Sequence, residues 1–364
     1  MGVRHSRVWR KAVVSNSTHL RSSERANAQY EHGGVAQRSA CAEAVLIPSI
    51  IAAGMVALLT ACDSSGKGAM AMPSRLWSID GDGEVGVHAA IEIPPDAIGM
   101  AAAAGEVWII EPDGVIQVHP AKGIHRTIPL PGRPTTIEID TKLGGWIGGR
   151  GPSDDGLLWN IDPETASVVQ TVHLPNTPES LAIAASASPP TVWVISPAVG
   201  TILQIDATSG GIVGSNYFGE DMSDIATDSS LAWVAFDQDQ TVMPVPSLDL
   251  PSPFFHEGQK YSVPGADALA ATEDTLWVLD AGGERVFPVD LLADHVGTPI
   301  SVGSRPTTIG LDGAYLWVAN NRSITRIDRT SHGRSTIAFS RPLSFIATTQ
   351  GPRTMVWVLA DGTA

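Results

Sequence analysis

The chain has 364 residues, of which 38 are acidic and 23 are basic, so its formal net charge is −15. This acidic balance excludes nucleic acid as a partner, because the surface would repel the phosphate backbone. The two cysteines, Cys41 and Cys62, provide no disulfide framework once Cys41 is removed with the segment described next. Stability must then come from buried apolar residues.

An uncharged apolar segment covers residues 44–61 and ends directly at Leu59-Thr60-Ala61-Cys62. This pattern resembles a bacterial lipoprotein signal peptide, in which the cysteine after a small-residue cleavage site becomes lipidated. We therefore expect residues 1–62 to be a signal peptide with an unusually long polar head. Cys62 would carry the lipid, such as palmitate, and anchor the protein to the cell membrane, facing outside the cytoplasm. The alternative is a single transmembrane anchor, since 18 apolar residues can just span a bilayer.

A flexible linker of small and polar residues is expected over residues 63–74. Beyond Cys62 the chain retains 16 basic and 35 acidic residues, a net charge of −19. Such a surface repels anionic lipid headgroups, so the mature domain would be tethered beside the membrane instead of lying flat on it.

Seven copies of one pattern follow, each centred on a tryptophan set among small or branched apolar residues. These tryptophans are separated by 38 to 47 residues: Trp108, Trp146, Trp193, Trp233, Trp277, Trp317 and Trp357. A repeat near 40 residues with short β-rich segments is typical of a β-propeller, in which each repeat forms one four-stranded blade. Residues 75–364 are therefore predicted to form an all-β, seven-bladed propeller.

Three further marks recur in phase with the tryptophan and define four strands per repeat. Strand A has a turn followed by an apolar residue, as in Pro306-Thr307-Thr308-Ile309, and strand B carries the tryptophan. Strand C often ends in Ile-Asp, and strand D is a β-branched stretch such as 168–172. The pattern begins on a C strand and ends on a B strand, so we expect residues 75–80 to pair with 355–359 and close the ring.

The repeated tryptophans are interpreted as packing residues between blades, not as ligand-stacking residues. The aspartates that end the C strands are interpreted as turn residues, because a carboxylate there accepts hydrogen bonds from the next backbone N–H groups.

Catalytic signatures are weak, and the catalytic residues stay unknown at this level. The histidines beyond Cys62 are expected in outer strands or C–D turns, away from the central channel: His88, His119, His125, His173, His256, His295 and His332. We find no loop with calcium-binding spacing, P-loop or dinucleotide fingerprint, and therefore predict neither a metal nor a cofactor.

Three arginines precede the A strands of blades 2, 6 and 7 and would gather on one arc of the channel mouth: Arg133, Arg305 and Arg341. Because a guanidinium group suits carboxylates and phosphates, we expect these residues to bind an anionic group of a ligand. The alternative is that they form ion pairs that merely cap the channel.

The repeat resembles the YVTN-type and streptogramin-lyase-like (virginiamycin B lyase-like) propellers, best seen in Val302-Gly303-Ser304-Arg305-Pro306-Thr307-Thr308-Ile309 followed by Leu316-Trp317-Val318. The resemblance implies the propeller fold but not one function. We expect a non-catalytic binding module whose channel face takes an envelope protein, a glycan or a small anionic ligand. The alternatives are a lyase or lactone hydrolase, whose channel histidine has no counterpart here, and a structural scaffold.

Overall fold

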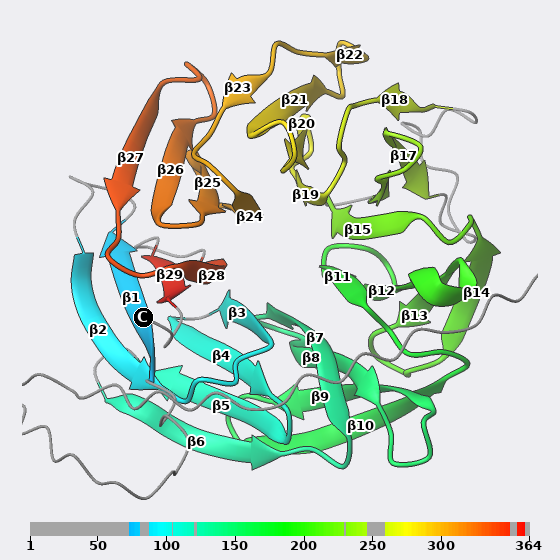
Figure 1. Ribbon diagram of the computed structural model, residues 1–364. Helices are drawn as coiled ribbons and strands as arrows, with labels where there is room; N and C mark the ends of the chain where they lie inside the picture. The colour runs from blue at the N-terminus through cyan, green and yellow to red at the C-terminus, as the bar shows by residue number, and fades with distance from the viewer. Residues whose placement is uncertain are drawn as a thin grey trace, which may run out of the picture. The chain divides into compact units, whose positions relative to one another are not determined.

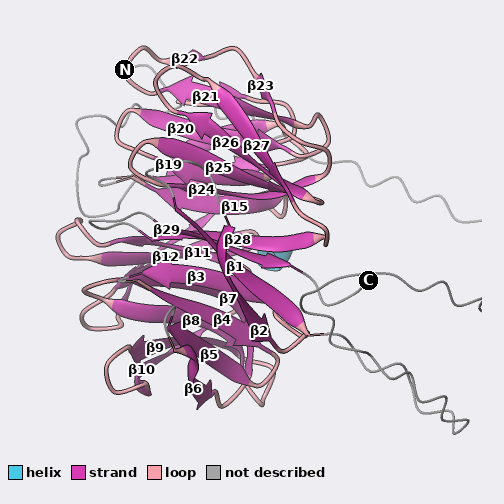
Figure 2. Cartoon of the chain, turned by 90° about the vertical axis from the view of Figure 1, so that its left-hand side faces the viewer, coloured by secondary structure: helices cyan, strands magenta, loops and turns pink. Residues whose placement is uncertain are grey.

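The computed structural model describes residues 73–80, 87–103, 105–119, 122–228, 231–245, 259–349 and 355–360. Within these ranges the regular secondary structure is almost entirely β-strand, and the strands form seven antiparallel sheets arranged around a central axis (Figures 1 and 2). The predicted all-β seven-bladed propeller is therefore confirmed. The predicted signal peptide at 1–62, the lipidation residue Cys62 and linker residues 63–72 lie outside the described residues.

The innermost strand of each blade is the predicted A strand (Figure 1). These seven strands are β3 (Gly99–Ala103), β7 (Arg133–Asp140), β11 (Ser180–Ala184), β15 (Met222–Thr227), β19 (Ala268–Ala271), β24 (Pro306–Leu311) and β28 (Leu343–Thr349). Each contacts the A strands of both neighbouring blades, so together they enclose the channel.

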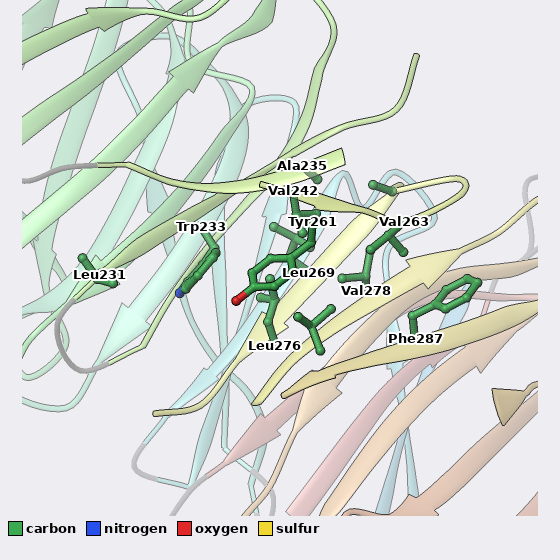
Figure 3. Close-up of a cluster of buried hydrophobic side chains, with 12 residues drawn as sticks. Leu231, Trp233, Ala235, Val242, Tyr261, Val263, Leu269, Leu276, Val278 and Phe287 are labelled. Atoms are coloured by element: carbon green, nitrogen blue, oxygen red, sulfur yellow. The ribbon is translucent and has the colours of Figure 1, made fainter. Parts of the chain in front are cut away.

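The tryptophan of each repeat lies on the second strand of its blade. The seven B strands are β4 (Glu106–Glu111), β8 (Gly144–Arg150), β12 (Thr191–Ser196), β16 (Ala232–Phe236), β20 (Thr275–Asp280), β25 (Tyr315–Asn320) and β29 (Met355–Ala360). None of the seven indole side chains is more than 4% exposed. Trp233, for example, packs in a cluster that joins blade 4 to blade 5 through Leu269 and Val278 (Figure 3). The packing role predicted for the tryptophans is thus confirmed.

The C strands come third in each sheet: β1 (Ser74–Asp80), β5 (Gly114–His119), β9 (Gly156–Asp162), β13 (Thr201–Asp206), β17 (Thr241–Val245), β21 (Arg285–Asp290) and β26 (Ser323–Asp328). The aspartates at their ends act as predicted. Asp206 Oδ1 accepts hydrogen bonds from the backbone N–H groups of Thr208 and Ser209 at 2.8 and 3.2 Å, and Asp328 repeats this with Thr330 and Ser331. These N–H groups lower the pKa of both carboxyls.

The D strands form the outer rim: β2 (Val87–Ile93), β6 (Gly123–Pro129), β10 (Ser167–Leu174), β14 (Ile212–Tyr217), β18 (Tyr261–Ser262), β22 (His295–Val296), β23 (Ile300–Ser301) and β27 (Arg334–Ala338). Among the described residues, blades 4 and 5 have two-residue segments here. Their C strands carry Pro244 and Pro288 opposite the tryptophan, where the other blades have residues with a backbone N–H. Because proline cannot donate to the outer ladder, Pro288 interrupts the pairing of β21 with the rim, which in blade 5 is divided into β22 and β23.

The seventh blade combines both ends of the described propeller, in the order β2-β1-β29-β28. The register of β1 against β29 runs from Arg75 opposite Ala360 to Asp80 opposite Met355. Apart from the strands, the described residues include one short 3₁₀ turn, η1 (Pro197–Val199). No helix in the described part of the chain is long and apolar enough to cross a membrane.

Candidate binding cavity in the channel

Side chains of neighbouring A strands bind one another's backbone across the channel wall. Thr227 Oγ1 on β15 donates to the carbonyl of Ile183 on β11 at 2.9 Å, and Thr348 Oγ1 on β28 donates to that of Leu311 at 2.5 Å. The inner edge of an A strand has no further strand to pair with. These hydroxyls satisfy backbone groups that would otherwise depend on water in the channel.

Asp224 on β15 makes the most extensive of these connections. Its carboxylate accepts the backbone N–H of Leu269 in blade 5 at 2.9 Å, the hydroxyl of Ser180 in blade 3 at 2.9 Å and the N–H of Ile225 at 2.8 Å. Burial raises the pKa of Asp224, and the three hydrogen bonds lower it in part. The residue therefore joins three consecutive blades.

A cavity of about 510 Å³ occupies the channel and is lined by residues from all seven A strands. The lining is mainly alanine, isoleucine, leucine and threonine, and its only charged residues are Glu138 and Asp140. Most of the lining residues lie in the later part of their A strands. Examples are residues 138–141 at the end of β7, 309–311 of β24 and 346–348 of β28. The cavity therefore lies toward the end of the channel where the A strands run into B strands, called the A–B end below; the opposite end is the D–A end.

Glu138 occupies a position at which every other blade has a small residue. It pairs with Trp146 across β7 and β8. The residues opposite the equivalent tryptophans are Ala101, Ala182, Ala226, Ala270, Gly310 and Ala347. Residues directly opposite each other in an antiparallel pair lie side by side on one face of the sheet. A bulky indole therefore leaves space only for a small residue opposite it. Blade 2 alone places a long acidic side chain there.

The carboxyl group of Glu138 has a pKa raised to about 7, first by burial and then by the negative charges of Asp224 and Asp140. Water in the lumen reaches the side chain, although the surrounding ring encloses it. Asp140 differs from Glu138, because its Oδ1 accepts the N–H groups of Lys142 and Leu143 at 2.7 and 2.9 Å and so supports the following turn.

The three arginines predicted to bind an anion are at the D–A end and do not line the cavity. Arg133 is the first residue of β7, whereas Arg305 directly precedes β24 and has a positive φ of 51°. Arg341 donates through Nη1 to the carbonyl of Pro73 at 3.0 Å. No ion pair joins the three to a carboxylate within the described residues. Their role in binding an anion stays a prediction.

Acidic residues also gather at the D–A end. Burial and nearby Asp96 and Asp113 raise the pKa of Glu111. Burial likewise raises the pKa of Asp267, with a contribution from Asp237 and Asp280, although Asp267 Oδ2 accepts the N–H of Ala281 at 2.7 Å. The arginines therefore belong to a mouth of mixed charge.

No histidine is among the residues that line the cavity. In the described part of the chain no three His, Cys, Asp or Glu residues are grouped so that they could hold a metal ion.

Sequence reasoning missed Glu138, although a signal for it was present. The A strands were recognised by their turn and apolar residue, such as Pro134 and Ile137, and the residue after the apolar one was not compared between blades. In that comparison Glu138 stands against five small residues and Ile346, and only the strand register places Ala347 opposite Trp357 in the seventh blade.

No family model and no curated protein matches the sequence. Solved structures with the same architecture include a chain of the mitotic checkpoint complex, with 11% identity, a TM-score of 0.58 and coverage of 84% of this chain and 100% of that one. The Pan2 WD40 domain of Neurospora crassa has 11% identity, a TM-score of 0.56 and coverage of 72% and 89%. Virginiamycin B lyase from Staphylococcus aureus has 13% identity, a TM-score of 0.55 and coverage of 79% and 99%. These similarities establish the β-propeller fold alone.

Proposed function

We propose that this protein is a binding module that holds a ligand in the cavity of its central channel. The observation that carries the proposal is the cavity itself, to which all seven A strands contribute. Its volume of about 510 Å³ lies within the range of roughly 300–1,000 Å³ found for small-molecule sites. Its lining residues are mainly apolar in type, but most of the surface that a ligand would meet is polar.

Filling the cavity tests this function. Ala226 lines the cavity, so Ala226→Phe should abolish binding of compounds selected on the purified full-length chain by ligand-observed NMR. The control is Ala293→Phe, which adds the same ring in an exposed turn between β21 and β22. Unchanged binding by a folded Ala226→Phe variant would contradict a ligand site in the channel.

We also propose that Cys62 carries a lipid that anchors the propeller on the outer side of the cell membrane. The uncharged segment at 44–61, followed directly by Cys62, supports this proposal. Cys62→Ala should abolish incorporation of labelled palmitate and leave an unprocessed chain. Incorporation of the label by the variant at the wild-type level would exclude this anchor.

A second ligand contact is proposed at the D–A end, where Arg133, Arg305 and Arg341 would bind an anionic group of an envelope protein, a glycan or a small ligand. Within the described residues none of the three guanidinium groups forms an ion pair with a carboxylate, although Arg341 donates to the carbonyl of Pro73, and this favours contact with an anion. Changing all three to Gln should weaken binding of a sulfated glycan, tested with Arg126→Gln on the outer strand β6 as the control.

The alternative function is a lyase or lactone hydrolase. A carboxyl group in the cavity with a pKa of about 7 favours it, because such a group can accept a proton near neutral pH. A screen of lactones and cyclic depsipeptides should then find turnover that Glu138→Gln abolishes. Turnover that survives this substitution would exclude Glu138 as the base.

A further inference from the structure

We infer that the cavity recognises a ligand bearing a protonated amine, and that Glu138 binds its ammonium group. This inference rests on the proposed binding function, since it names the ligand class for the same cavity. It is supported by the position of Glu138 in the repeat, its lack of a partner and the charge of the channel wall.

The repeat shows that the fold does not require Glu138. Six blades place alanine or glycine opposite the tryptophan, and their B strands bury that tryptophan as fully as blade 2 does. A glutamate at this position adds a carboxyl group where a side chain no larger than a methyl group is enough for the packing of the blade. A residue that departs from a structural rule without helping the fold is expected at functional sites.

Glu138 also has no partner that would explain its charge. Within the described chain, no hydrogen bond or ion pair is found for its carboxylate, whereas Asp224 and Asp140 both accept backbone N–H groups. Its side chain lines the cavity and is enclosed by the ring of strands. Its charge is met only by water in the lumen, so a positively charged group in the cavity would gain a charge-assisted contact with it.

None of the described residues that line the cavity is basic, so none of them could fill this role. The seven A strands include only four charged residues, namely Arg133, Glu138, Asp140 and Asp224. Arg133 is at the exposed start of β7 and does not line the cavity. Two acidic residues, Glu138 and Asp140, therefore line the cavity, and no basic residue is among the described residues that line it, which disfavours anions.

The rest of the lining specifies what kind of cation fits. Polar atoms make up the larger part of the accessible lining, with hydroxyl groups from Thr141 and Thr227, and alanine, isoleucine and leucine side chains supply a smaller apolar part that can contact a short alkyl chain. An ammonium group has three N–H donors, and a charge-assisted bond to a carboxylate is about twice as strong as a neutral one. A metal ion is a poor alternative, because the described residues include no group of three ligands for it. An alkylammonium ligand can place its ammonium group on Glu138 and its short chain against the apolar side chains of the lining.

Three probes of equal chain length but different charge test the inference: hexylammonium, hexanoate and hexan-1-ol. Each is titrated at pH 8, where Glu138 is ionised, into the full-length chain, and binding is followed by ¹⁵N NMR and calorimetry. Hexylammonium should bind at least about tenfold more tightly than the other two. Glu138→Gln should remove this preference, whereas Glu273→Gln, in an exposed turn between β19 and β20, should preserve it.

The outcomes separate this inference from the proposed function. Equal binding of the three probes in the cavity would overturn ammonium recognition but keep the cavity as a ligand site. Tight binding of hexanoate, or a preference for hexylammonium that survives Glu138→Gln, would also overturn it, as would failure of hexylammonium to bind. Failure of the cavity itself is detected separately by the Ala226→Phe variant.

Discussion

At the D–A end of the channel, charged groups take part in the structure of turns, whereas at the A–B end Glu138 has no structural task. Asp280 at the D–A end is 4% exposed and accepts hydrogen bonds from Gly283 N at 2.6 Å and Arg285 Nε at 2.7 Å. Glu138, on the same ring of blades, has no such partner in the described chain. The difference teaches that a charged residue in a propeller can be assigned to fold or to function by asking what its polar atoms bind.

The largest effect is expected from removing an acid that connects blades. Asp224→Ala would leave the N–H of Leu269 without its acceptor and free the hydroxyl of Ser180. An unsatisfied buried donor costs about 1–3 kcal/mol, so we expect a loss of about 2–3 kcal/mol in the free energy of unfolding. Urea denaturation measures it. Destabilisation below about 0.5 kcal/mol would mean that these bonds contribute little.

The substitution Glu138→Ala should increase the free energy of unfolding, in contrast to Asp224→Ala, because it restores the residue type that the other blades have at this position. Replacing an outlier by the consensus of its repeat commonly stabilises a protein by about 0.5–2 kcal/mol, and we expect about 1 kcal/mol at pH 8. The same urea experiment measures it, with Glu273→Ala as the control for removing an exposed acid. A clear loss of stability in Glu138→Ala would show that the fold depends on this carboxylate.

The pH dependence of the free energy of unfolding should reveal the raised pKa of Glu138. Glu138 has a pKa of about 7 in the folded chain, against an ordinary value of 4.5. Between these pH values the folded chain holds a proton that the unfolded chain has released, so stability falls as pH rises from about 4.5 to 7. Glu138→Gln should make this part of the profile flatter, as thermal unfolding in matched buffers will show. Parallel profiles for the two proteins would contradict the raised pKa.

The smallest effect is expected at the D–A end. Arg305 has a φ of 51°, a conformation that glycine adopts without strain. Arg305→Gly should therefore change stability by less than about 1 kcal/mol, in the stabilising direction. Arg305→Val, which resists a positive φ, is the matched comparison. If the glycine variant were less stable than the valine variant, backbone strain at this position would not be the deciding factor.

The sequence predicted the blades well because the period of about 40 residues is carried by large side chains that every blade must bury. Trp146 and its six counterparts are visible without any structure, and they set the phase of all four strands. The cavity was not predictable in the same way. Whether small residues such as Ala226 leave an open lumen depends on how closely seven strands approach the axis, which no local pattern reports.

The candidate site was predicted only in part. Arg305 and Arg341 precede their A strands and Arg133 begins one, but the cavity is nearer the other end of those strands. Glu138 was overlooked because a single glutamate on a strand is unremarkable by itself. Its meaning emerges only when the strand register aligns it with Gly310 and the five alanines.

The seventh blade has a consequence for the order in which the chain can acquire its structure. Strand β1 is among the first propeller residues to be synthesised, yet one of its two neighbours, β29, is among the last. A nascent chain therefore keeps one edge of β1 open until synthesis is nearly finished, and chaperones would have to protect that edge from pairing with other chains. Joining the adjacent ends by circular permutation, with new termini between two intact blades, would remove this delay.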